Sequence, residues 1–174
     1  MKVEILGKRR NNLMFNTGDK VVYPLYGAGV IDAIEEHTVL GELQRYYIVR
    51  LLIGGMKVMV PVMPIKEQMK LRKIIEKDDM NRVMDVLENS QIPIIQDWKA
   101  RYQTNLEKMK TGCIYKVAEV TKNLFCRNKE KGLSSAEKRL FETACSAITS
   151  EIAFVQDIGL EQANIMVSTI LAQN

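Results

Sequence analysis

The sequence predicts an α+β protein of two domains, in which a small, strongly bent antiparallel sheet or barrel is followed by an all-helical bundle. Short runs of β-branched and aromatic residues separated by glycine turns fill residues 15–62, a pattern typical of antiparallel strands. From Glu67 onward the apolar residues recur at three- and four-residue steps, which is typical of helices that bury one face. The change of pattern near residues 65–72 marks the expected domain boundary, and 174 residues suffice for two small cores.

Glycine and proline divide the strand-rich part into four segments. We expect strands over residues 20–24, 30–35, 43–52 and 56–62. Gly54-Gly55 predicts a tight hairpin turn between the last two strands. Pro24 lacks the N–H that a ladder needs, so it is expected at an edge or a strand end. In the last strand, alternation places Lys57 and Met59 on one face.

Caps and breakers divide the helical part in the same way. The first helix is expected from about Glu67 and must end before Pro93, because proline disfavours the helical conformation of the residue before it. Gly112 stands where a left-handed C-terminal cap would end the second helix, and Ser134 with Glu137 fits a capping box. The remaining helices are expected over residues 94–110, 115–129, 134–152 and 160–171.

Composition removes several kinds of chemistry. The three cysteines form no Cys-x-x-Cys pair and His37 is the only histidine, so we expect no metal, no cofactor and no catalytic residue. No apolar run approaches the ~18 residues that cross a membrane, and the start of the chain lacks the regions of a signal peptide. We therefore expect a cytoplasmic protein with no membrane partner and no small-molecule substrate.

Charge is concentrated in one part of the chain. The formal net charge is +4, but residues 99–139 carry 11 basic and 4 acidic side chains, a local excess of 11 − 4 = +7. The flanking residues 75–98 and 140–174 each carry an excess of four acidic side chains. A basic block of this kind favours a polyanion through the release of counterions, although a solvated helix face has the same composition.

Trp98, the single tryptophan, opens this basic block. A large ring among cations can stack on or wedge between bases while the cations hold phosphates. Trp98, Tyr102, Leu106 and Met109 also follow the spacing of a core-facing helical stripe. From the residues alone, the spacing favours the core-facing interpretation, and the wedge stays as the alternative.

Two sets of motifs give the chain a resemblance to a known family. The first is Phe15-x-x-Gly18-Asp19-x-Val21-Val22-Tyr23-Pro24-x-x-Gly27-x-Gly29-x-Ile31, followed by Tyr46-Tyr47 and Val58-x-Val60-Pro61. The second is Trp98-x-x-Arg101-Tyr102-x-x-Asn105-x-Glu107-Lys108, Lys116-Val117-Ala118-Glu119-Val120 and Lys131-Gly132-Leu133-Ser134-x-x-Glu137-Lys138-Arg139. From Phe15 to Gln156 the chain resembles the CarD/CdnL family of bacterial transcription regulators, and residues 1–13 form an extension outside the match.

The resemblance implies a Tudor-like domain over residues 14–70 that binds the β subunit of RNA polymerase. It also implies a helical domain over residues 71–174 that contacts promoter DNA at the upstream edge of the melted region and stabilises the open complex. The family's wedge tryptophan falls on Trp98, and its DNA-facing basic positions fall on Arg101 and Lys138. With neighbouring basic and aromatic residues, the expected DNA-binding set is Trp98, Lys99, Arg101, Tyr102, Lys108, Lys116, Lys138 and Arg139. The expected polymerase-binding set is His37, Arg50, Lys57, Met59 and Pro61, where His37 and Met59 replace arginines of some relatives.

Two alternatives remain. The basic helices could bind an acidic protein, which would make the chain a protein-interaction adaptor. An enzyme would need paired carboxylates, a nucleophile motif or a metal cluster, and none emerges from the sequence.

Overall fold

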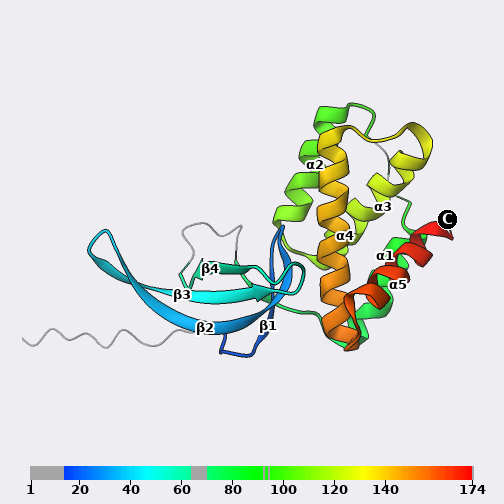
Figure 1. The fold of residues 1–174 in the computed structure, drawn as a ribbon. Helices are drawn as coiled ribbons and strands as arrows, with labels where there is room; N and C mark the ends of the chain where they lie inside the picture. The colour runs from blue at the N-terminus through cyan, green and yellow to red at the C-terminus, as the bar shows by residue number, and fades with distance from the viewer. Residues whose placement is uncertain (1–13, 64–69, 92, 94, 174) are drawn as a thin grey trace, which may run out of the picture.

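A bent antiparallel sheet lies beside a bundle of helices in the computed structural model, which describes residues 14–63, 70–91, 93 and 95–173 (Figure 1). The strands in this part of the chain are β1 (Lys20–Tyr23), β2 (Gly27–Val39), β3 (Glu42–Leu51), β4 (Lys57–Pro61) and β5 (Arg72–Lys73). The α-helices are α1 (Met80–Asn89), α2 (Trp98–Lys110), α3 (Ile114–Lys131), α4 (Ser135–Gln156) and α5 (Leu160–Ala172). The predicted α+β class is confirmed, whereas the extension over residues 1–13 lies outside the described residues.

The sheet has the strand order β4-β3-β2-β1-β5, with each described neighbour antiparallel. Strands β2 and β3 form a long hairpin that reaches away from the helices (Figure 1). Its tight turn places Leu40 and Gly41 at positive φ, and the expected turn at Gly54-Gly55 also has positive φ at both residues. One side of the sheet covers a small core that includes Phe15, Val21, Ile31, Val49 and Val60.

The link between sheet and helices differs from the expectation. Arg72 and Lys73 form β5, which pairs with β1, so the sheet continues past residue 70. Ile74 and Ile75 were expected in the first helix but lie outside it; they are half-buried against the helical core, which accounts for their apolar character. The first helix begins only at Met80, and its expected start at Glu67 falls outside the described residues.

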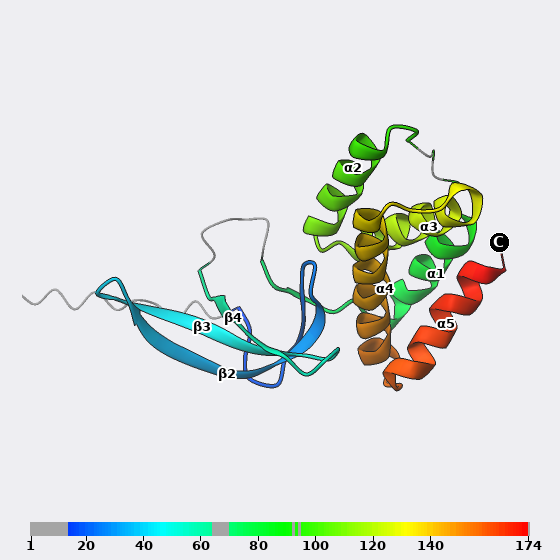
Figure 2. The ribbon, with the colours of Figure 1, turned by 45° about the horizontal axis from the view of Figure 1, so that its top comes forward.

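Helix α4 runs through the middle of the helical bundle and contacts α2, α3 and α5 (Figure 2). The predicted capping box is present, because the Ser134 hydroxyl accepts from the Glu137 amide and the Glu137 side chain accepts from the Ser134 amide. Gly112 follows α2 at a φ of 66°, as expected for a left-handed cap. No helix in the part of the chain that the structure describes is long and apolar enough to cross a membrane.

The turn between β1 and β2 packs directly on α4. The Ala28 amide donates to the Ser150 hydroxyl over 2.9 Å. At Gly27, a Cβ atom would lie 2.7 Å from that same hydroxyl, so only glycine permits this approach. Arg72 of β5 adds an ion pair to the buried Glu151 of α4, with distances of 2.6 and 2.7 Å. Glu151 also accepts from the Ile75 amide, so a polar clamp holds the sheet to the helices.

Candidate nucleic-acid and protein-binding surfaces

Trp98 stands exposed at the first residue of α2. The Asp97 carboxylate caps this helix by accepting from the Ala100 amide over 2.7 Å, which places Trp98 in the first turn. The ring is 49% exposed, so the core-facing interpretation is wrong for this residue. The fully buried residues of α2 are Arg101, Asn105 and Met109, while Tyr102 and Leu106 are only half-buried. The buried face of α2 is therefore rotated by about one residue from the predicted stripe.

Arg101 is the main correction among the expected DNA-binding residues. Its side chain is only 2% exposed, because the guanidinium lies 2.6 Å from the Glu137 carboxylate. The same guanidinium donates through Nη1 to the carbonyls of Ile95 and Gln96, over 2.6 and 3.2 Å. The side chain is buried and its donors are used within the protein, so Arg101 does not present its charge to a phosphate.

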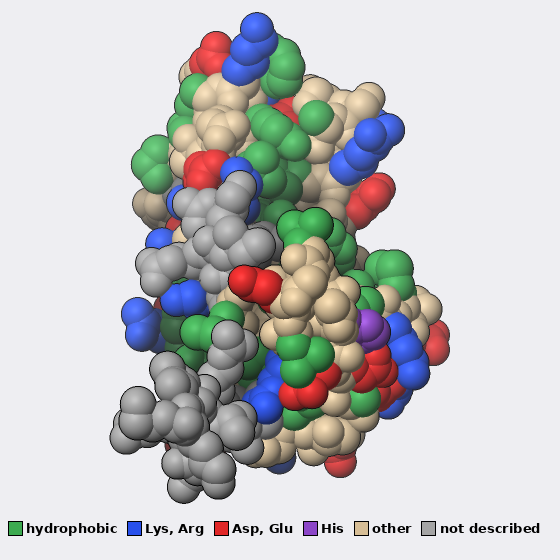
Figure 3. Space-filling model, turned by 90° about the vertical axis from the view of Figure 1, so that its left-hand side faces the viewer, with side chains coloured by type: hydrophobic (Ala, Val, Ile, Leu, Met, Phe, Trp, Pro, Cys, Tyr) green, Lys and Arg blue, Asp and Glu red, His purple; other side chains and the backbone are tan. Residues whose placement is uncertain are grey.

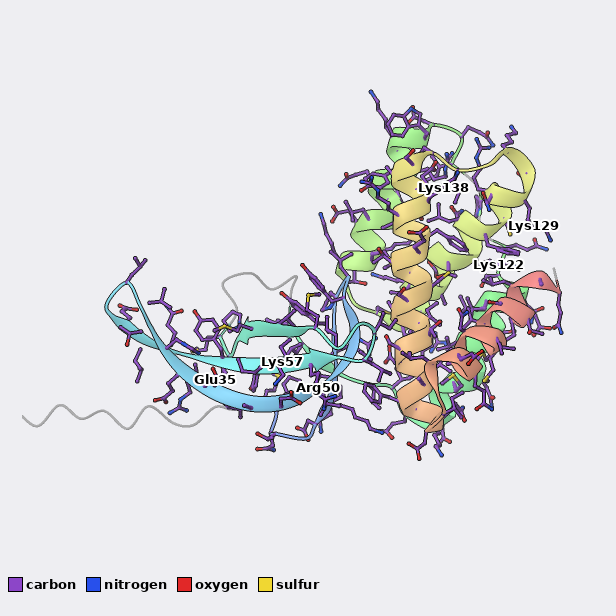
Figure 4. The ribbon with its side chains drawn as sticks, viewed as in Figure 1. Glu35, Arg50, Lys57, Lys122, Lys129 and Lys138 are labelled. Carbon is purple, nitrogen blue, oxygen red and sulfur yellow. The ribbon has the colours of Figure 1, made fainter. Side chains whose placement is uncertain are left out.

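Lys99 follows Trp98 directly in α2, and Lys138 and Arg139 lie near the start of α4; all three side chains are exposed. The Arg101–Glu137 pair holds the first turn of α2 beside the first turn of α4, which brings Lys138 and Arg139 toward Trp98. Figure 4 shows Lys138 at this end of α4, far from the sheet. We call Trp98, Lys99, Lys138 and Arg139 the Trp98 tip. The N-terminal ends of two helices meet there and add partial positive charge.

Three further residues of the expected DNA-binding set are not part of this tip. Lys108 is in the last turn of α2, ten residues from Trp98, and pairs with Glu119 of α3 over 2.8 Å. Lys116 is exposed in the first turn of α3, and Tyr102 packs half-buried against the helical core. The structure therefore gathers four of the eight expected residues as exposed side chains, buries Arg101 behind them, half-buries Tyr102, and places Lys108 and Lys116 elsewhere.

Buried polar groups hold the helices behind the tip. Asn105 of α2 donates to Asn123 of α3 over 3.3 Å, and the buried Lys122 donates to the Glu88 carbonyl near the end of α1. Burial alone would raise the pKa of Glu137, but hydrogen bonds from Arg101 and Ser134 outweigh it and hold the pKa below its ordinary value. Glu137 is therefore a carboxylate at neutral pH.

The five expected polymerase-binding residues share one face of the sheet. In the register, His37 lies opposite Gln44, while Lys57, Met59 and Pro61 lie opposite Arg50, Ile48 and Tyr46. Because residues of β3 two apart point the same way, these side chains all lie on the outward face, which we call the outer sheet face. Figure 3, which views the molecule from the end of the β2–β3 hairpin, shows the histidine with acidic and basic side chains next to it.

Charges on the outer sheet face are mostly paired within it. Asp32 accepts from Arg50 over 3.0 Å and from Lys57 over 3.2 Å, and His37 lies 2.9 Å from Glu35. Desolvation alone would raise the pKa of Asp32. The hydrogen bonds from Lys57 and Arg50 outweigh this effect and hold the pKa below its ordinary value. Met59 is 50% exposed and adds an apolar patch between these charges.

Strand β4 is the open edge of the sheet, because among the described residues it pairs only with β3. The Leu51 amide donates to the Met56 carbonyl and the Val62 amide to the Arg45 carbonyl, which fixes the alternation of the ladder. In an antiparallel pair this alternation turns the backbone groups of Lys57 and Met59 away from β3. Pro61 occupies the next outward position, where its missing N–H costs no bond to β3.

Several residues that build these surfaces were missed in the sequence. The sequence patterns did not identify Asp97 as the N-cap of α2, Glu137 as the partner of Arg101, or Glu151 as the partner of Arg72. They also did not identify Asp32 as the acid between Arg50 and Lys57. Only Asp97 and Glu137 carried a local signal, because each stands three residues from its backbone partner. The ion pairs join distant segments and left no local pattern.

Other chemistry finds little support. Within the described ranges, no three His, Cys, Asp or Glu side chains gather where they could hold a metal ion. The three cysteines are free and half-buried. Burial raises the pKa of the Cys145 thiol to about 12, which keeps it protonated and a poor nucleophile.

Comparison with known proteins matches both parts of the chain. Residues 15–75 match the model of the CarD-like/TRCF RID domain, and residues 82–168 match the model of the CarD C-terminal domain. The chain is also 36% identical over 149 residues to a Bacillus subtilis (strain 168) protein named "Putative transcription factor YdeB". That alignment covers 86% of this chain and 97% of the relative.

Proposed function

The chain belongs to the CarD family of transcription regulators, and from this premise we propose that it bridges RNA polymerase and promoter DNA. In the proposal, the sheet binds the polymerase β subunit and the Trp98 tip binds DNA at the upstream edge of the melted region. The observation that carries it is the presence of two different exposed surfaces on two modules that are clamped together. One is the open edge of β4, and the other is an exposed tryptophan among cations.

The β4 edge supports binding by strand addition. A partner strand would pair with the outward backbone groups of Lys57 and Met59, while side chains of the outer sheet face contact the partner beside it. His37 and Met59 lack the charge of the arginines at these positions in some relatives. Here specificity would come from the shape and apolar character of Met59 and Pro61 more than from new ion pairs.

The Trp98 tip supports binding to partly melted DNA. An indole with half of its surface exposed can stack on a base or wedge into an opened step, while Lys99, Lys138 and Arg139 contact phosphates. A surface that binds the open form better than the closed form shifts the equilibrium by that difference in affinity. The regulator would therefore stabilise the open complex without any catalytic step.

Replacing Trp98 tests the DNA half of the proposal. We expect Trp98→Ala to shorten the lifetime of the open complex roughly tenfold, since base stacking contributes about 1–3 kcal/mol per base. Binding to the polymerase β subunit should not change. Ile165→Ala is the matched control, because Ile165 is also exposed but lies on α5. Equal lifetimes for Trp98→Ala and the unaltered protein would refute the wedge.

Replacing Met59 tests the polymerase half. Met59→Pro removes one outward N–H but leaves the bonds between β4 and β3 intact, so we expect about tenfold weaker binding to the β subunit. Met59→Ala keeps the N–H and removes the side chain, so it distinguishes the contribution of the backbone from that of the side chain. If Met59→Pro binds as well as Met59→Ala, the partner does not pair with this edge.

The adaptor remains the alternative because exposed lysines also fit an acidic protein. Affinity for a forked promoter duplex, measured as salt is raised, separates the two. DNA binding should fall steeply, by a slope of roughly −0.9 per phosphate contacted. A flat response with the forked duplex would favour the adaptor.

A further inference from the structure

We propose that the buried Arg101–Glu137 pair is the anchor that positions Trp98, and that Arg101 acts on DNA only through this anchor. The inference rests on the proposed function and assigns a role to a residue that the family resemblance places against DNA. The polar bonds of the pair hold the backbone around Trp98, so both members are positioning residues.

The Arg101 guanidinium joins the chain before Trp98 to the helix after it. Arg101 follows Trp98 by three residues and is part of α2. Its Nη1 donates to the carbonyls of Ile95 and Gln96, which precede Trp98 by three and two residues. Motion of the first turn of α2 relative to the preceding segment would break these bonds. The backbone that carries Trp98 is thereby fixed.

The Glu137 carboxylate binds groups from both α2 and the start of α4. One carboxylate oxygen lies 2.6 Å from Arg101, and the other accepts from the Ser134 amide and hydroxyl over 3.0 and 2.8 Å. Glu137 therefore caps α4 and holds α2 at the same time. Lys138 and Arg139 follow it directly in α4, so the ring and the exposed cations belong to one rigid unit.

No fully buried apolar residue of α2 lies beside Trp98 to replace this anchor. The buried residues of α2 are Arg101, Asn105 and Met109, and only Met109, in the last turn, is apolar. Ile95, just before the helix, is 37% exposed, and the Lys99 ammonium lies 5.8 Å from the centre of the indole ring. Fully buried apolar packing therefore lies at the far end of α2, whereas the fully buried group nearest to Trp98 is the polar anchor.

Because Trp98 is the only tryptophan, its fluorescence reports on the anchor without DNA. In the full chain, we expect Glu137→Gln and Arg101→Met to lower the fluorescence anisotropy of Trp98 and to raise its quenching by acrylamide. Arg101→Lys should show a partial effect, because one ammonium cannot reach all the acceptors. Arg72→Met is the matched control, because it breaks the Arg72–Glu151 pair, which is remote from Trp98. It should leave both the anisotropy and the quenching unchanged.

Affinity for a forked duplex separates an anchor from a phosphate contact. Removing an acid should strengthen DNA binding by charge alone, but loss of the anchor predicts that Glu137→Gln weakens it roughly tenfold. Arg101→Met should weaken binding with an unchanged salt slope, whereas Lys138→Gln should reduce the slope by about 0.9.

The proposal is overturned if Glu137→Gln binds DNA as tightly as the unaltered protein, or if Arg101→Met lowers the salt slope like Lys138→Gln. Unchanged Trp98 anisotropy in both anchor variants would also overturn it. If Trp98→Ala leaves the affinity for DNA unchanged, it is the proposed function that fails, and the fluorescence in the free protein still decides on the anchor. Glu137→Gln keeps the size of the side chain, so it serves if Arg101→Met does not fold.

Discussion

Two arginine–glutamate pairs occupy opposite ends of α4, and they differ in what they join. Glu137 is in the first turn and holds Arg101 of α2, whereas Glu151 lies 14 residues later and holds Arg72 of β5. At 1.5 Å per residue the two glutamates are about 21 Å apart along the helix. One pair joins two helices behind the Trp98 tip, and the other joins the two modules. Helix α4 is thus the common frame for both surfaces.

Burial separates the pairs further. Both side chains of Arg101–Glu137 are 2% exposed, while Arg72 is 27% exposed and its partner Glu151 only 1%. A charge that loses its partner is most costly where water cannot replace it. The Arg101–Glu137 pair should therefore contribute more to the free energy of unfolding. The Arg72–Glu151 pair should matter more for how the two modules are held together.

The largest effect is expected for Arg101→Met, which leaves Glu137 buried without its positive partner. We predict that the free energy of unfolding falls by about 3–5 kcal/mol. Urea denaturation followed by circular dichroism measures this change. A loss below about 1 kcal/mol would mean that the pair contributes no more than a surface ion pair, and the contrast between the two pairs would disappear.

A smaller effect is expected for Arg72→Met, because water can reach part of this site. We predict a loss of roughly 2–3 kcal/mol and greater independence of the two modules. Hydrogen exchange at the Ala28 amide, which donates to Ser150 across the interface, should become faster. Unchanged protection of that amide would show that the glycine contacts hold the modules together without the clamp.

The smallest effect is a pH dependence that sharpens the comparison. The pKa of Glu137 lies below its ordinary value of 4.5, so its carboxylate stabilises the fold above that pH. This stabilisation should be constant near neutral pH and disappear as pH falls through the lowered pKa. Urea unfolding of the unaltered protein and Glu137→Gln at pH 7, 5, 4 and 3 measures it. A difference between the two proteins that stays constant down to pH 3 would contradict the shift.

The sequence predicted the elements better than it predicted their contacts. The Gly54-Gly55 turn, the Ser134 capping box and the alternation of Lys57 and Met59 are local patterns, and the structure confirms each of them. The strand expected over 30–35 is longer, because β2 begins at Gly27 and ends at Val39. The short strand β5 has too few residues to show a period, so Arg72 and Lys73 were read as the start of a helical region.

The candidate site shows the same division. Trp98 was expected as an exposed wedge, and its exposure is confirmed, while its contact with DNA stays a prediction. Arg101 was placed against DNA because the family resemblance implies a DNA-facing basic residue at this position. Its burial depends on Glu137, 36 residues away, and no periodicity in α2 reveals such a partner.

The short open edge of β4 also bears on how long a bound strand would remain in place. Only Lys57 and Met59 offer both backbone groups outward, and Pro61 then ends the row of donors. Hydrogen bonds that each contribute about 1 kcal/mol net would give a strand a weak hold on this edge alone. Weak contacts dissociate quickly, since affinity is expressed mainly in the off-rate. Under the proposed function, a complex whose DNA is also held by the Trp98 tip would stay, and one that lost that second contact would depart.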